Sequence, residues 1–307
     1  VTVTGTNDGP VISNGPDTAS LTETDAALTS TGNLTVTDLD TANTVNVSRT
    51  LSVSGSSNRS DAAAPTDAQL LDMLSLSADN STWSTASLAL IDSTHTTGTL
   101  YWKFHSGSEA FNYLATGETL VLTYTVSATD DDGTPLSDTE TVTITITGTN
   151  DAPVITQGPD TVDLTETNLA LSSSGTLTVS DVDTSDVVTA ARTLLVSSSS
   201  DRTDPAAPND ASLLAMFSVS PTTVLDSTQN SATLNWAFDS ASQAFDYLQK
   251  KAFRISILDK QKRADGRGQH ASLLEREGVP DAQIVDAGAG VAHLEFVLHR
   301  LGPGDIF

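Results

Sequence analysis

The sequence predicts an all-β protein made of two β-sandwich units in tandem, and three observations support this. The chain of 307 residues is long enough for about two domains. Thr and Val are abundant and are punctuated by Gly and Pro, which favours strands over helices. A long internal repeat then sets the boundary between the units.

The repeat is visible where the chain enters each unit. Residues 5–12, Gly-Thr-Asn-Asp-Gly-Pro-Val-Ile, return at 148–155 as Gly-Thr-Asn-Asp-Ala-Pro-Val-Ile, an offset of 143. After a nine-residue deletion the offset becomes 134, so that Trp102 corresponds to Trp236. The correspondence stops at Leu248. We therefore expect the second unit to lack its last two strands.

The repeat divides the chain into four segments. They are residues 1–9, the closing strand and linker of a preceding repeat; 10–149, the first repeat; 150–248, a truncated second repeat; and 249–307, an atypical tail. The first assignment rests on the match of Val1–Thr4 with Ile144–Thr147. It predicts that the sequence is a piece of a longer array.

Three segments of the first repeat alternate apolar and polar residues with the period of two that is typical of half-buried strands: 98–104, 119–129 and 139–147. Short strands with turn signals between them indicate a sandwich. We interpret 34–37 as the second strand, and 119–129 as the sixth, of a seven-stranded Greek-key arrangement.

A short helix is predicted within each repeat. The first follows Pro65, with Thr66 as its N-cap and with Leu70, Leu71 and Leu74 on one face. Its counterpart follows Asn209, and the corresponding apolar residues are Leu213, Leu214 and Phe217.

The charge is strongly negative. Lys and Arg number 14 and Asp and Glu number 39, which gives a formal net charge of −25. Such a surface repels nucleic acid and anionic lipid, and it also repels itself, so bound cations would relieve strain in the compact state. The chain has no Cys, so no disulfide stabilises it, and no run of about 18 apolar residues that would span a membrane.

Asp-rich loops are predicted to meet at one end of each sandwich. In the proposed topology the loops 38–40 and 130–133 follow strands that end at the same pole, where the linker also enters. Carboxylate and amide oxygens converging from three segments suit Ca²⁺, which takes six to eight oxygen ligands. The predicted ligands at this pole are Asn7, Asp8, Asp38, Asp40, Asp130, Asp131 and Asp132 in the first repeat, and Asn150, Asp151, Asp181 and Asp183 in the second.

Glu23 is a further predicted calcium ligand, at the opposite end of the first sandwich. There it would face the Asn150-Asp151 linker of the next repeat and close a site shared between domains. The alternative for every one of these clusters is a turn without metal, because Asp and Asn are also ordinary turn residues.

Several motifs together resemble the VCBS-type repeats of giant bacterial adhesins of the repeats-in-toxin, type I secreted kind. These are the linker 148–155, the stretch 106–114 (Ser-Gly-Ser-Glu-Ala-Phe-Asn-Tyr-Leu), and Gly-Glu-Thr-Leu at 117–120 followed by Asp-Asp-Asp-Gly at 130–133. The resemblance covers about residues 1–248. It implies immunoglobulin-like or cadherin-like sandwiches in tandem, calcium between domains, export from a Gram-negative cell, and adhesion or biofilm formation.

Enzymatic interpretations are weak. His95 and His105 do not recur in the second repeat, and neither belongs to a recognisable nucleophile–base pattern. Trp102 and Trp236 recur at alternating strand positions, which favours core packing over a sugar-stacking platform. We expect a protein that is not an enzyme.

The tail from residue 249 changes abruptly to Lys, Arg, Gln and Gly, and a weakly helical stretch is expected over 281–301. Three explanations stay open: a shift of reading frame that leaves a disordered tail, a terminal cap or recombination junction, and a small separate domain.

The function expected from the sequence is a structural and adhesive repeat module on the exterior of a bacterium. Its partners would be neighbouring repeats of the same chain, together with cell-surface glycans or matrix. The alternative is a carbohydrate-binding or accessory module of a secreted enzyme.

Overall fold

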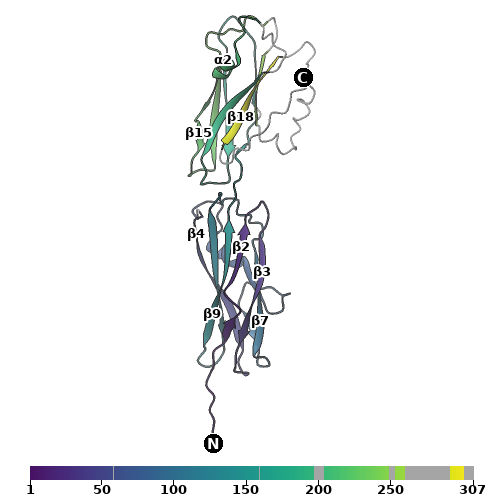
Figure 1. Cartoon of the computed structure of the whole chain (residues 1–307), viewed down its shortest axis with the longest axis vertical. Helices are drawn as coiled ribbons and strands as arrows, with labels where there is room; N and C mark the ends of the chain where they lie inside the picture. Colours follow the sequence, from purple (N-terminus) through teal and green to yellow (C-terminus); the bar gives the residue numbers. More distant parts are fainter. Residues whose placement is uncertain (58, 159, 197–203, 249–252, 260–290, 301–307) are drawn as a thin grey trace. The chain divides into compact units, whose positions relative to one another are not determined.

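The computed structural model describes the chain except for residues 58, 159, 197–203, 249–252, 260–290 and 301–307, and beyond residue 248 it describes only the backbone of two strands. The chain divides into two compact units, Val1–Asn150 and Asp151–Phe307 (Figure 1). The described regular elements of both units are strands, apart from one short helix in each. None of the described helices is long and apolar enough to cross a membrane.

The first unit is a sandwich of two sheets. One sheet has the order β1 (Val11–Ser13), β3 (Thr29–Thr37), β7 (Thr97–His105) and β5 (Leu74–Ser77). The other has the order β2 (Asp17–Thr22), β9 (Ser137–Thr147), β8 (Thr119–Thr129), β4 (Val45–Gly55) and β6 (Leu88–Ile91). The unit therefore contains nine strands and not the predicted seven. One additional strand precedes residues 34–37, which belong to the third strand and not the second, because the first part of the chain forms two short strands that join different sheets. The other lies between 34–37 and 119–129, so that 119–129 is the eighth strand and not the sixth. Residues 1–10 form no strand.

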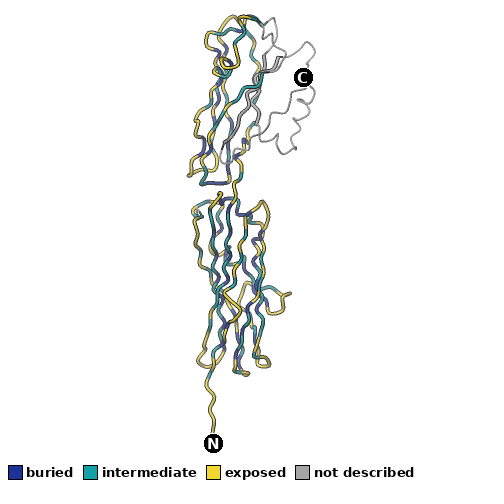
Figure 2. The backbone as a smooth tube through the Cα atoms, viewed as in Figure 1, coloured by how far each residue is buried: buried dark blue, intermediate teal, exposed yellow. Residues whose placement is uncertain are grey.

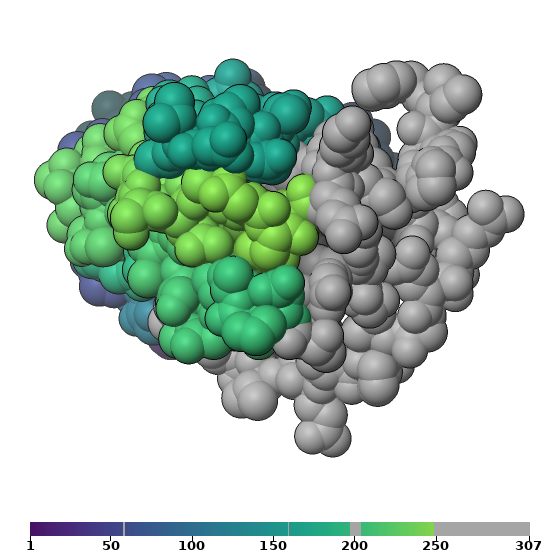
Figure 3. Space-filling model, turned by 90° about the horizontal axis from the view of Figure 1, so that it is seen from above, coloured from purple at the N-terminus to yellow at the C-terminus, as the bar shows by residue number. Residues whose placement is uncertain are grey.

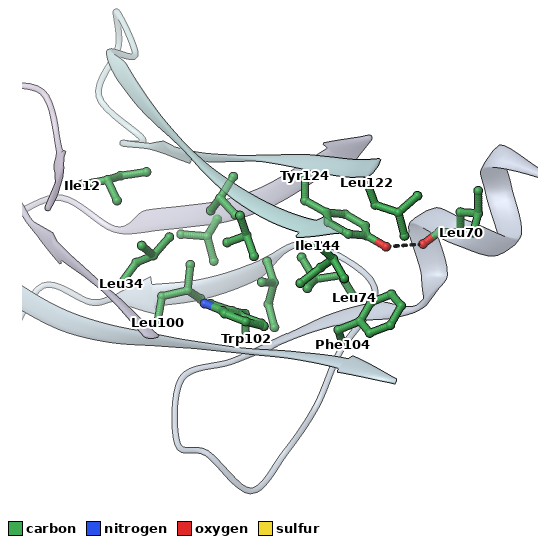
Figure 4. Close-up of a cluster of buried hydrophobic side chains, with 14 of the residues drawn as sticks. Ile12, Leu34, Leu70, Leu74, Leu100, Trp102, Phe104, Leu122, Tyr124 and Ile144 are labelled. Atoms are coloured by element: carbon green, nitrogen blue, oxygen red, sulfur yellow. Dashed lines mark hydrogen bonds between the residues drawn. The ribbon is translucent and has the colours of Figure 1, made fainter. Parts of the chain in front are cut away.

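Alternation along the strands creates the core. In β8, Leu120, Leu122, Tyr124 and Val126 are all buried while the Thr residues between them are half-exposed, as the period of two predicts. The last six residues of β7 and of β9 alternate in the same way, and Figure 2 shows buried positions along the strands of this unit. Side chains of both sheets meet in one cluster, in which Leu34 and Leu100 lie opposite Leu122 and Ile144 (Figure 4).

Helix α1 (Asp67–Asp72) closes one side of this core. Thr66 caps it as predicted, and Gln69 completes a capping box by accepting a hydrogen bond from the Thr66 backbone. The Tyr124 hydroxyl donates a hydrogen bond of 2.6 Å to the carbonyl of Leu70, which joins the helix to the sheet (Figure 4). Leu74, expected on the helix face, instead begins β5.

The second unit repeats the first sheet closely. Its order is β10 (Val154–Ile155), β12 (Ser172–Ser180), β16 (Ser231–Asp239) and β14 (Phe217–Ser220), which are the counterparts of β1, β3, β7 and β5. Helix α2 (Asp210–Ala215) follows the predicted cap Asn209, and Phe217, like Leu74, begins a strand. Teal, green and yellow-green segments that are distant in the sequence pack side by side in this unit (Figure 3).

The other sheet of the second unit differs from its counterpart. Its order is β11 (Asp160–Leu164), β17 (Phe253–Asp259), β18 (Val291–Arg300), β13 (Val188–Val196) and β15 (Thr223–Leu225). The tail thus supplies strands in the places of β9 and β8, where the sequence predicted only a loss. Both run in the reverse direction: β17 is antiparallel to β11, and β18 is parallel to β13. The helix expected over 281–301 is wrong for residues 291–300, and the rest of that stretch lies outside the described residues.

A hydrogen bond between the two sheets occurs in both units. The Trp102 indole on β7 donates to Asp17 Oδ2 on β2 at 2.8 Å, and Trp236 donates to Asp160 Oδ2 at 2.9 Å. Both indoles are buried, which agrees with the predicted core packing. Gly32 makes room for the first pair, because a Cβ there would lie under 3.0 Å from both Asp17 Oδ2 and the Trp102 ring.

We predict that Gly32→Ala destabilises the first unit by about 1–3 kcal/mol, because the added methyl group forces the Trp102–Asp17 pair apart. Urea unfolding followed by fluorescence measures the loss. Gly133→Ala is the matched control, since a Cβ there meets no atom within 4 Å. Equal stability of the two variants would show that the pair tolerates displacement.

Candidate metal site at the acidic end of each sandwich

Three segments meet at one end of the first sandwich. They are the entering linker, the loop after β3 and the loop after β8. The Asn7 side-chain amide donates to Asp130 Oδ2 at 3.0 Å, and the Asp8 backbone N–H donates to Asp40 Oδ2 at 2.6 Å. The structure therefore brings predicted residues from all three segments together at this acidic end.

A residue that the sequence analysis did not select connects the same segments. The Asn43 side-chain amide donates to Asn7 Oδ1 at 3.0 Å, and the neighbouring Thr44 N–H donates to Asp131 Oδ1 at 2.8 Å. Asn43 is buried. The repeat offset of 143 places Asp186 at the corresponding position of the second unit. A polar residue at this position in both repeats is the signal in the sequence from which Asn43 could have been selected.

The carboxylates also organise their own loops. Asp38 Oδ1 accepts the Asp40 N–H at 2.9 Å, and Asp130 Oδ1 accepts the N–H groups of Asp132 at 3.3 Å and Leu136 at 3.1 Å. Such hydrogen bonds are expected if the Asp residues form ordinary turns without a metal. These hydrogen bonds leave some lone pairs of the carboxylate oxygens free, because each oxygen can accept more than one hydrogen bond.

Burial makes this end electrostatically unfavourable. Asp38 and Asp130 are only 2% and 3% exposed. Burial raises the pKa of Asp38, and the charges of Asp130, Asp40 and Asp8 raise it further, although the hydrogen bond from the Asp40 backbone opposes them. Asp38 Oδ2 has no hydrogen-bond partner within the described part of the chain.

The second unit shows the same arrangement around fewer segments. The Asp151 N–H donates to Asp183 Oδ2 at 2.7 Å, and the Asp183 N–H donates to Asp181 Oδ1 at 3.2 Å. Burial, reinforced by neighbouring carboxylates that include Asp186, raises the pKa of Asp181 to about 6 and that of Asp183 to about 7. Asn150 is exposed and is the last residue of the first unit.

Glu23 lies at the other end of the first sandwich, as predicted, and is 2% exposed. Its Oε1 accepts hydrogen bonds from both the backbone N–H and the hydroxyl of Thr149, and its own N–H donates to the Thr147 carbonyl at 2.9 Å. Glu23 therefore fastens the linker that follows β9 to the sandwich from which the linker emerges.

The donor chemistry suits a hard cation, but the side chains are not assembled around one. Buried carboxylate oxygens without hydrogen bonds, Asp38 Oδ2, Asp181 Oδ2 and Asp183 Oδ1, are the groups that a cation would satisfy. Across the described residues, no group of three or more His, Cys, Asp or Glu side chains is spaced to hold a metal. Binding would require the loops to exchange some turn hydrogen bonds for metal contacts.

Comparison with known proteins leaves the family open. Neither a protein-family model nor a curated protein sequence matches the chain. Similar solved structures include the CooA pilin subunit of enterotoxigenic Escherichia coli, with 15% identity, coverage of 46% of this chain and 99% of that chain, and a TM-score of 0.31. Another is AggA, the major subunit of aggregative adherence fimbriae type I from Escherichia coli, with 14% identity, coverage of 48% of this chain and 99% of that chain, and a TM-score of 0.27. A third is the pilus backbone RrgB of Streptococcus pneumoniae, with 9% identity, coverage of 91% of this chain and 51% of that chain, and a TM-score of 0.22. At such TM-scores the fold rests on the strand order of the chain itself.

We predict that the metal-free second unit loses stability as the pH rises from about 4 to 7. The folded state holds protons on Asp181 and Asp183 that the unfolded chain, with an ordinary Asp pKa of 3.8, has already released. The loss should be several kcal/mol, because each pKa unit between the folded and unfolded states is worth about 1.4 kcal/mol. Chemical unfolding in the presence of a chelator at several pH values measures it.

Asp183→Asn is the control for this prediction. It keeps the side-chain acceptor for the Asp151 N–H but cannot ionise, so stability should depend less on pH and should exceed that of the unsubstituted chain at pH 8. An unchanged pH profile in this variant would contradict the assignment.

Proposed function

We propose that this chain is a structural and adhesive module of a large secreted or surface-attached bacterial protein, and that it has no catalytic activity. Two sandwiches with corresponding first sheets, joined by a linker that recurs in sequence, support a spacer built from repeated units. The residues that carry the resemblance to VCBS-type repeats support the same proposal. The exterior of a Gram-negative cell is the proposed location, with cell-surface glycans or matrix as further partners.

The observation that carries the proposal is the buried, uncompensated acidic end. In the first unit it holds Asp38 and Asp130 in the interior, and neither carboxylate takes part in any of the ion pairs described in the chain. A divalent cation would neutralise these charges and satisfy Asp38 Oδ2. We propose calcium, because oxygen ligands from a flexible set of loops suit it better than Mg²⁺.

The residues that would hold calcium belong to the linker and to the loops beside it. They are Asn7, Asp8, Asp38, Asp40, Asp130, Asp131 and Asp132 in the first unit, with Asn43 supporting them, and Asp151, Asp181 and Asp183 with Asp186 in the second. Asn7 and Asp8 lie where the chain enters the sandwich, so a cation here would fix the direction of the entering linker. A stiffened linker is the property that a spacer needs.

Titration calorimetry of the full chain tests this proposal. We expect calcium uptake with a dissociation constant of about 10⁻⁴ to 10⁻³ M, the usual range of extracellular modules. Asp38→Asn combined with Asp181→Asn should weaken it about tenfold or more by removing a buried charge from each unit. Small-angle scattering should show a longer chain with calcium than with chelator.

Asp61→Asn is the matched control. It removes one carboxylate charge beyond the far end of β4 while keeping a side-chain acceptor for the Ala63 N–H. This variant should bind calcium as the unsubstituted chain does. Absence of heat at millimolar calcium would rule out the metal. If Asp61→Asn weakened binding as much as Asp38→Asn alone, each of which removes one charge, the effect would be one of net charge.

A further inference from the structure

The two sandwiches differ at one sheet edge. In the first unit ten residues, 78–87, connect β5 to β6. In the second unit the nine-residue deletion falls at this connection, and Pro221 alone corresponds to the whole loop. The strands on either side, β14 and β15, keep their places in the two sheets.

The loop of the first unit covers the edge of its own sheet. Leu76 and Ser84 exchange two backbone hydrogen bonds, each of 2.9 Å, so that a short piece of extended chain lies beside β5. The loop also places an aromatic ring on the outer face of the sheet, where Lys103 Nζ lies 4.8 Å from the centroid of the Trp83 ring. Edge and outer face are thus covered by one segment.

In the second unit the corresponding backbone groups are open. Val219 occupies the position of Leu76 and pairs with Trp236 as Leu76 does with Trp102. The Met216 carbonyl accepts the Asp239 N–H, so alternate residues of β14 face β16 and the N–H and C=O of Val219 point away from it. Among the residues that the structure describes, neither group has a hydrogen-bond partner.

A hollow lies on the outer face beside this edge. It has a volume of about 350 Å³ and is lined mainly by Ser174, Thr176, Ser218, Ser220, Asn235 and Ala237. Ala237 stands where the first unit has Lys103, and Asn235 where it has Tyr101. The hollow has no charged lining residue, so it suits an uncharged ring.

We propose that the β14 edge of the second sandwich accepts an extended peptide from a separate partner protein, with an aromatic side chain of that peptide in the hollow. Backbone groups at a sheet edge are a template for an added strand, and pockets for alternate side chains give such binding its specificity. The first unit shows the occupant that fits, because its own loop pairs with the equivalent residue and carries Trp83 over the equivalent surface. β14 is short and Pro221 follows it directly, so the contact spans few residues and the ring dominates the affinity.

A fluorescein-labelled peptide with the sequence of residues 78–87, Ala-Asp-Asn-Ser-Thr-Trp-Ser-Thr-Ala-Ser, tests the proposal by fluorescence anisotropy against the full chain. We expect saturable binding, and a peptide with Ala in place of Trp should bind about tenfold more weakly, as for an aromatic anchor. Val219→Pro, which removes the outward N–H, should abolish binding. Lys103→Ala, in the unit whose edge is already covered, should leave it unchanged.

A second variant tests the same edge if Val219→Pro fails to fold. Replacing Pro221 by residues 78–87 restores in the second unit a loop that already folds in the first, and it should abolish peptide binding by occupying the edge. Absence of saturable binding, or equal binding to this loop-restored variant, would overturn the proposal. Self-association of the chain that the restored loop abolishes would also overturn it, because the occupant would then be a second copy.

Discussion

Carboxylates buried where the chain enters each sandwich constrain the rest of this structure. Asp38 and Asp130 cannot move to water without opening the loops that end β3 and β8, because their oxygens hold those loops and the linker together. Each hydrogen bond to a charged acceptor stabilises the turn, yet the charges oppose one another in a poorly solvated place. The same side chains therefore fix the entry of the chain and leave unfavourable charge there, which explains why this end, and not the well-packed core, is where a cation would act.

Much of the fold follows from patterns in the sequence. The bounds of β8 are those predicted, and Thr66 and Asn209 cap the two helices, because strand alternation and capping are local properties. The sequence pattern predicts helix faces for Leu74 and Phe217, although each begins a strand, because a leucine or phenylalanine one turn after a helical residue fits both patterns. The strands at 253–259 and 291–300 were not foreseen, because they match nothing in the first repeat and pair through backbone groups that carry no sequence signal.

The acidic end was predictable only in part. The topology placed the linker beside the loops at 38–40 and 130–132, even though the number of strands was wrong, because β3 and β8 end at the same pole whatever precedes them. Burial could not be foreseen from the sequence, since the order Asp-x-Asp is equally common in exposed turns. The sequence also does not reveal that the pKa values of Asp181 and Asp183 are raised, because this depends on the burial of each carboxyl and on the neighbouring charges, which include Asp186. Glu23 was placed at the correct end, but its bonds to Thr149 were not anticipated.

The reversed strands of the second unit bear on how a β-sandwich can change in evolution. Backbone hydrogen bonding accepts a neighbour in either direction, so β11 and β13 are joined to strands whose sequence and polarity differ from those of β9 and β8. A deletion or splice within the last third of a repeat therefore need not leave a gap in the sheet if the new sequence can form two extended segments. The first sheet of a sandwich can therefore persist while unrelated sequence completes the second sheet.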